Sequence, residues 1–196
     1  MKRVLSSLFV LLLLCLALLA AGCGSKKSAQ NTTTFVRVLP DATTPAEWAD
    51  RIVNIFLRPL NQDLGVVSGF NNPQIKLYIA SQNPTTLHII NTRMNDLKRC
   101  TSKLTQIGPP PKGDPRLNTI NAKFHRACAD YEVVADELLK ATPFLSSGRS
   151  DVIQKGEDMI RSVRDESGRA ADNLAAAVRI AQRLHEFRRA GLKPSV

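Results

Sequence analysis

The stretch DPRLNTINAKFHRACADYEVVADELLKAT, residues 114–142, decides the fold of this 196-residue chain. Apolar side chains recur in it at intervals of three and four, the spacing of one face of an α-helix. These positions are Ile120, Phe124, Cys128, Tyr131, Ala135 and Leu138. Asp114 can cap the helix and Pro115 suits its first position, whereas Pro143 is expected to end it. The stretch therefore predicts one long amphipathic helix with a buried face.

An earlier helix is expected to begin after Thr44, which can cap it, with Pro45 at the first position and Glu47 completing a capping box. Pro59 is expected to kink this helix. Its apolar stripe consists of Trp48, Ile52, Ile55, Phe56, Leu60, Leu64 and Val67.

A short helix is predicted over 75–80, and Asn83 with Pro84 repeats the cap-then-proline signal for a second long helix. That helix is expected to end at Gly108. Three prolines follow it directly, so the second and third long helices should be antiparallel neighbours.

The last helix is expected to run from Ser150, which can cap it, to about Ala190. Small residues lie along its stripe, which allows a neighbouring helix to approach closely. These are Gly156, Ser167, Ala170, Ala177 and Ala181. Forty residues at 1.5 Å each would span about 60 Å, so a break near Gly168 or a protruding end is expected.

These segments predict an all-α fold, an antiparallel helical bundle of about four long helices. No stretch shows the two-residue alternation of a strand. The length suits one domain, which we assign to 44–191, with a short tail over 192–196.

The first 23 residues have the composition of an export signal. Lys2 and Arg3 precede an apolar run over 4–19, and Ala20-Ala21-Gly22 leads to Cys23. This order resembles the lipobox of bacterial lipoproteins, with Ala20 at the place where Leu is usual. The resemblance implies that 1–22 is cleaved as a signal peptide and that Cys23 carries acyl chains such as palmitate.

In that case 23–43 is a flexible tether, and the protein is anchored in lipid at the extracytoplasmic face of a cell membrane. The alternatives for the leader are an ordinary cleaved signal peptide and an uncleaved single-pass helix.

Two cysteines of four remain if Cys15 leaves with the signal peptide and Cys23 carries lipid. An even remainder in an exported chain indicates a disulfide, and antiparallel helices would bring Cys100 and Cys128 together. The alternative is a reactive or metal-binding thiol, since His125 lies three residues before Cys128. A metal needs further ligands, and none is near in the sequence.

The chain is basic, with a formal net charge of +10. Two clusters of basic residues stand out: Arg93, Lys98, Arg99 and Lys103, and then Arg179, Arg183, Arg188 and Arg189. Such patches can bind anionic lipid, an anionic wall polymer or an acidic face of an envelope protein. The alternative is an ordinary solvated helix face. Nucleic acid is not expected as a partner, because the chain is read as exported and is poor in aromatic residues.

The sequence contains no zinc-protease motif, no nucleophile elbow, no glycine-rich phosphate loop and no haem-attachment motif. We therefore assign no catalytic residue, no cofactor and no metal site. The function that remains is a non-enzymatic binding or assembly module of the cell envelope. The alternative is a carrier or sensor of a small apolar ligand in a pocket lined by Phe56, Met94, Phe124, Tyr131 and Phe144.

Overall fold

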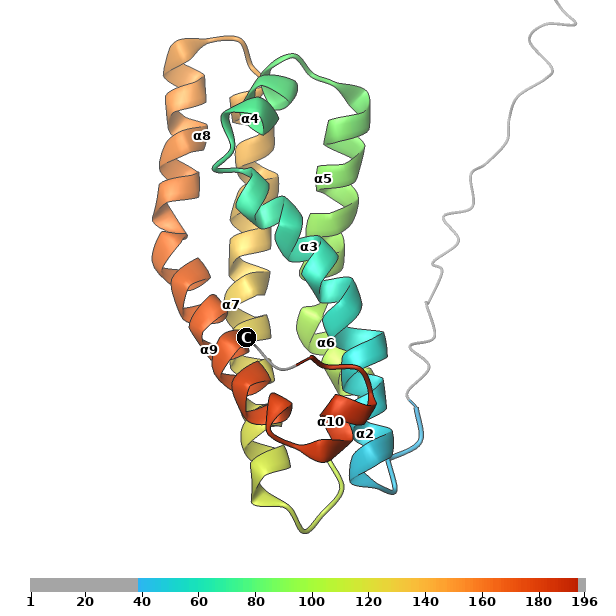
Figure 1. Ribbon diagram of the computed structural model, residues 1–196. Helices are drawn as coiled ribbons and strands as arrows, with labels where there is room; N and C mark the ends of the chain where they lie inside the picture. The colour runs from blue at the N-terminus through green and yellow to red at the C-terminus, as the bar shows by residue number, and fades with distance from the viewer. Residues whose placement is uncertain (1–38, 194–196) are drawn as a thin grey trace, which may run out of the picture. The chain divides into compact units, whose positions relative to one another are not determined.

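The computed structural model describes residues 39–193, and within that range the chain forms helices and no strand (Figure 1). The elements are α2 (Pro45–Arg51), the π-helix η1 (Ile52–Leu57), α3 (Arg58–Gly69), α4 (Pro73–Ala80), α5 (Pro84–Leu97), α6 (Cys100–Ile107), α7 (Pro115–Leu145), α8 (Ser150–Ser162), α9 (Arg164–Gln182) and α10 (His185–Arg189). The long helix α7 packs against α5, α6, α8 and α9. The predicted all-α bundle is confirmed, although it is built from more and shorter helices than four.

The helix that begins at Pro45 changes type twice before it ends at Gly69. Its predicted cap is present, since the Thr44 hydroxyl accepts the N–H of Glu47 at 3.2 Å. Pro59 has no N–H, and in an α-helix its ring would meet the carbonyl four residues earlier. The six residues of η1 come just before this position, and their wider turn accommodates the proline. The disturbance predicted at Pro59 thus takes the form of a π-helix.

The wider turn also changes which side chains face the core. Ile55 was expected in the buried stripe but is 50% exposed, so that prediction is wrong. Ile52, Phe56 and Leu60, spaced four apart, are all buried. A turn that holds more residues than the 3.6 of an α-helix keeps such a spacing on one face.

Asparagine caps begin the next two helices. The side-chain oxygen of Asn72 accepts the N–H of Gln74 at 2.9 Å, and that of Asn83 accepts the N–H of Thr86 at 3.0 Å. Pro84 follows the Asn83 cap in the first turn, as the sequence predicts, whereas the short helix predicted over 75–80 begins earlier, at Pro73.

The predicted second long helix is divided into α5 and α6 at Lys98 and Arg99. Glu132 of α7 accepts the N–H of Thr101 at 2.7 Å. This hydrogen bond satisfies one of the amide donors that the new N-terminus of α6 leaves free. The interruption is therefore stabilised from the neighbouring helix.

The decisive helix α7 begins at Pro115 as predicted, and the carboxylate of Asp114 accepts the N–H of Arg116 at 2.9 Å. Its predicted end before Pro143 is wrong, because the helix continues to Leu145. A proline this close to the end removes one hydrogen bond. The continued helix buries Leu145, which is 4% exposed, in the core.

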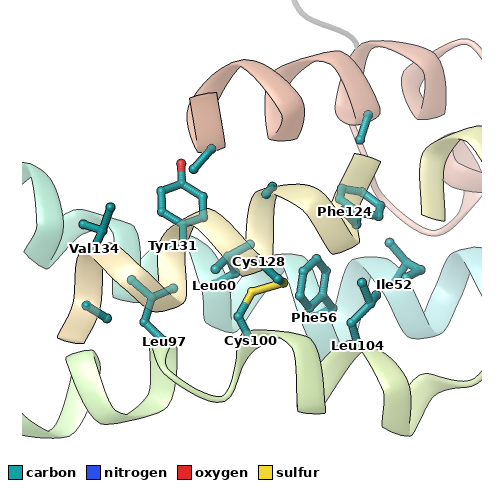
Figure 2. Packing of buried hydrophobic residues seen from close by; sticks show 14 of the residues in the cluster. Ile52, Phe56, Leu60, Leu97, Cys100, Leu104, Phe124, Cys128, Tyr131 and Val134 are labelled. Carbon is teal, nitrogen blue, oxygen red and sulfur yellow. A yellow bond between two sulfur atoms is a disulfide. The ribbon is translucent and has the colours of Figure 1, made fainter. Parts of the chain in front are cut away.

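Cys100 begins α6, Cys128 lies in the middle of α7, and the two form a disulfide with a Cα–Cα distance of 5.1 Å. Figure 2 shows the bond among the buried side chains between the two helices. The predicted pairing is confirmed. The alternative of a free thiol beside His125 does not fit, because both sulfur atoms belong to the bond.

The predicted last helix consists of three helices. It breaks at Val163, not near Gly168, and α9 ends at Gln182. Val163 is 5% exposed, so the break places an apolar side chain in the core while α8 and α9 both stay against α7. Ser150, the predicted cap, is the first helical residue, and Arg149 stands at the cap position without a side-chain hydrogen bond.

The core continues through the described part of the chain as a single cluster. Edge-to-face aromatic contacts join distant segments: Phe56 lies 5.4 Å from Phe124, and Trp48 lies 5.8 Å from Phe187, measured between ring centroids (Figure 2 shows the first pair). The second contact packs the short α10 against α2. The indole N–H of Trp48 donates to the carbonyl of Gly108 at 3.2 Å.

The segment before α2, residues 39–43, contacts the helices. The N–H of Leu39 donates to the carbonyl of Gln106 at 3.1 Å, and Ala42 is buried. The Arg51 guanidinium donates to the carbonyls of Pro40 and Ile107 at 2.5 and 3.2 Å. Residues 39–43, predicted as the end of the tether, therefore pack on the helices. The remainder of the predicted tether, Cys23 and the leader lie outside the described residues.

Candidate functional site

An open groove of about 540 Å³ lies between η1 and α3 on one side and α9 on the other. We call it the α3–α9 groove. Five apolar side chains that are only half-buried line it: Leu57, Leu64, Leu174, Val178 and Leu192. The volume is within the range of about 300 to 1,000 Å³ that is usual for small-molecule sites.

The π-helix takes part in forming this groove. Val53 and Leu57 belong to η1 and both line it, and Arg58 follows directly. Such segments are rare and often lie at functional sites. The opposite wall comes from α9, whose buried Ala170 and Ala177 lie against the bundle while Leu174 lines the groove.

Polar groups are few in the groove and include one cation. The amides of Asn61 and Gln62 line it together with the exposed Arg58. Arg58 makes no ion pair with any carboxylate of the described residues. Gly191 lies beside it, since a Cβ at Gly191 would be 3.5 Å from Nη2 of Arg58. The α3–α9 groove is thus apolar, with a single unpaired guanidinium.

The residues predicted to line a ligand pocket lie elsewhere. Phe56, Met94, Phe124 and Tyr131 are packed in the core, at most 4% exposed, and burial raises the pKa of Tyr131 to about 12. Of these four, Phe56 lines a cavity of only about 10 Å³. Phe144 is half-buried, and Lys155 Nζ lies over its ring, 4.8 Å from the ring centroid. These aromatic residues serve packing.

The first basic cluster is largely engaged with acids. Lys103 Nζ lies 3.4 Å from Asp96, and Lys98 Nζ lies 2.6 Å from Asp136. Arg93 approaches Asp63 at 3.5 Å. The acidic partners lower the net positive charge that this face presents to a partner. Arg99 is exposed and has no ion pair within the described range.

Asp63 lies between two cations of that cluster. Its side chain is 3% exposed and lies 3.5 Å from Arg93 Nη1 and 3.8 Å from Lys103 Nζ. Burial raises the pKa of Asp63, while the charges of Lys103 and Arg93 act in the opposite direction. Because the two cations belong to α5 and α6, this buried carboxylate of α3 lies close to both of those helices.

The second basic cluster is different. Its members are exposed and make no ion pair with a carboxylate in residues 39–193: Arg179, Arg183, Arg188 and Arg189. We call them the C-terminal arginines. Two of them are on α10, which contacts α2 and lies at the end of the bundle where the chain enters (Figure 1).

None of the described helices combines the length and the apolar character needed to cross a membrane. Within residues 39–193, no three side chains of His, Cys, Asp or Glu are grouped so that they could hold a metal ion. No family model, curated protein or solved structure matches this chain.

Proposed function

We propose that this chain is a lipid-anchored lipoprotein of the extracytoplasmic membrane face and that its helical domain acts by binding, within the cell envelope. The α3–α9 groove is the observation that supports the binding role. It leaves half-buried apolar side chains open to a ligand and places one unpaired cation beside them. The order of residues up to Cys23 supports the anchor.

A second contact is proposed for the C-terminal arginines. They lie at the end of the bundle where the chain enters from the proposed tether, and they have no acidic partner among the described residues. A basic surface held near a membrane gains about 1 kcal/mol for each Lys or Arg that approaches anionic head groups. We propose anionic lipid as the partner of this surface.

The anchor is tested by growing cells that make the full chain with an alkyne-tagged palmitate and following label and membrane fraction. Cys23→Ser is expected to abolish labelling, because the proposed acyl acceptor is lost. Cys15→Ser is the matched control, since Cys15 would leave with the signal peptide, and it should label as the unaltered chain does. Equal labelling of the Cys23→Ser chain would refute the anchor.

A further inference from the structure

We propose that the α3–α9 groove binds one fatty carboxylate, with its alkyl chain along the apolar walls and its head group on Arg58. This inference rests on the binding role proposed above and names the ligand of that site. It does not depend on acylation of Cys23.

The volume of the groove matches that of a single alkyl chain. A methylene group takes up about as much space as a water molecule in the liquid, roughly 30 Å³. A groove of about 540 Å³ therefore has room for one long chain and its head group. A lipid with two such chains would need about twice that volume.

The walls of the groove suit an alkyl chain. Leu57 and Leu64 on one side face Leu174 and Val178 on the other, and each of these side chains is half-buried. Covering apolar surface releases about 25 cal/mol for each Å² removed from water. A flexible alkyl chain can follow such walls without needing a polar partner along its length.

Arg58 favours a head group with a negative charge. Its guanidinium lines an otherwise apolar groove, and no carboxylate of the described residues pairs with it. A planar guanidinium can donate two parallel hydrogen bonds to a carboxylate. The amides of Asn61 and Gln62 line the same groove and can add hydrogen bonds to the head group. The absence of a side chain at Gly191 leaves the space beside Nη2 open.

The test uses residues 24–196, because the described residues belong to one compact unit with its own core and disulfide. Calorimetric titration compares hexadecanoate with hexadecanol and with a hexadecyl ammonium ion. One hexadecanoate is expected per chain, with affinity falling in the order carboxylate, alcohol, ammonium. Equal affinity for carboxylate and alcohol would overturn the assignment to an anion but leave the binding role standing. Failure of all three probes to bind would overturn the proposal that the groove binds an alkyl chain.

Two pairs of variants test whether the ligand lies in the α3–α9 groove. Arg58→Gln is expected to weaken hexadecanoate about tenfold and leave hexadecanol unchanged, since one charge-assisted contact is lost. Arg99→Gln, an exposed arginine outside the groove, is the control. Val178→Trp fills the groove and should abolish binding, whereas Val133→Trp, on the exposed face of α7, should not. Circular dichroism checks that each variant is folded.

Other occupants give distinct results. If hexadecanoate binds only after residues 194–196 are deleted, the end of the chain occupies the groove and the proposal is overturned. If Val178→Trp instead converts a dimer to a monomer in gel filtration, the groove is an interface between two copies, which also overturns it. Binding by the intact monomer supports the fatty carboxylate.

Discussion

Cys100 and Cys128 are bonded across the interface of α6 and α7, although 28 positions separate them in the chain. The bond closes a loop that contains the whole of α6, the turn with the three prolines over 109–111, and the first half of α7. A covalent link of this kind restricts the unfolded chain, in which the two helices would otherwise separate. The interruption between α5 and α6 lies directly beside it.

Breaking this bond is expected to lower the free energy of unfolding by about 3 kcal/mol. The test is urea unfolding of residues 24–196 carrying Cys100→Ala and Cys128→Ala together, followed by the fluorescence of Trp48, which is fully buried. Reduction of the unaltered chain should produce a similar loss. An unchanged midpoint in both experiments would show that the disulfide does not support the fold.

Gly156→Ala is expected to destabilise the protein by about 1 to 3 kcal/mol. A Cβ at this position would lie 3.0 Å from Leu145 Cδ2 and 3.1 Å from the Cβ of Phe144, so these side chains or α8 itself would have to shift by a few tenths of an ångström. Gly168→Ala is the matched control, because nothing lies within 4 Å of its Cβ position. That change should stabilise α9 by roughly 0.5 to 1 kcal/mol. Urea midpoints measure both, and equal effects of the two would contradict the close packing at Gly156.

Asp63→Asn is expected to raise the melting temperature at pH 7 and to have less effect at pH 3. Burial raises the pKa of Asp63 in the folded protein above its ordinary value of 3.8. As the pH rises past that value, the unfolded chain loses this proton first, so the free energy of unfolding falls until the folded protein has lost it too. Asparagine does not titrate and removes this dependence.

The measurement is a melting curve at several pH values, with the exposed Asp172→Asn on α9 as control. If Asp63→Asn lowered the melting temperature at pH 7, the charges of Arg93 and Lys103 would outweigh the cost of burying the carboxylate.

Arg188→Gln with Arg189→Gln is expected to weaken binding of residues 24–196 to phosphatidylglycerol vesicles by roughly thirtyfold. The reason is the loss of two unpaired charges at the end where the chain enters. Arg149→Gln with Lys155→Gln removes the same charge from α8 and the turn before it, and should change binding little. Cosedimentation at low and high salt measures this, since screening weakens such contacts. Equal losses in the two double variants would argue against an oriented surface.

The sequence predicts helix starts well because capping is local. Pro45, Pro84 and Pro115 begin helices in the structure, each after a side chain that accepts a backbone N–H. The partners of these caps lie within three residues, so no knowledge of the rest of the fold is required. The disulfide could also be predicted from a local feature. The three prolines over 109–111 end one helix shortly before the next begins, so the two helices are antiparallel neighbours and their cysteines can meet.

Interruptions within helices are harder to predict because their causes lie far away in the chain. The start of α6 depends on Glu132, and the passage through Pro143 brings Leu145 into the core beside α8. The α3–α9 groove could not be predicted either, because its two walls come from segments more than 100 residues apart. Pro59 within an apolar stripe was the one local signal, and it was interpreted as a kink.

The way Arg51 holds the incoming chain has a mechanical consequence. Its guanidinium joins the carbonyls of Pro40 and Ile107, so a pull on the segment before Leu39 is transmitted to the end of α6 as well as to α2. From α6 the load passes through a covalent bond into the middle of the longest helix. We therefore expect α2 to resist unfolding when the segment before Leu39 is under tension.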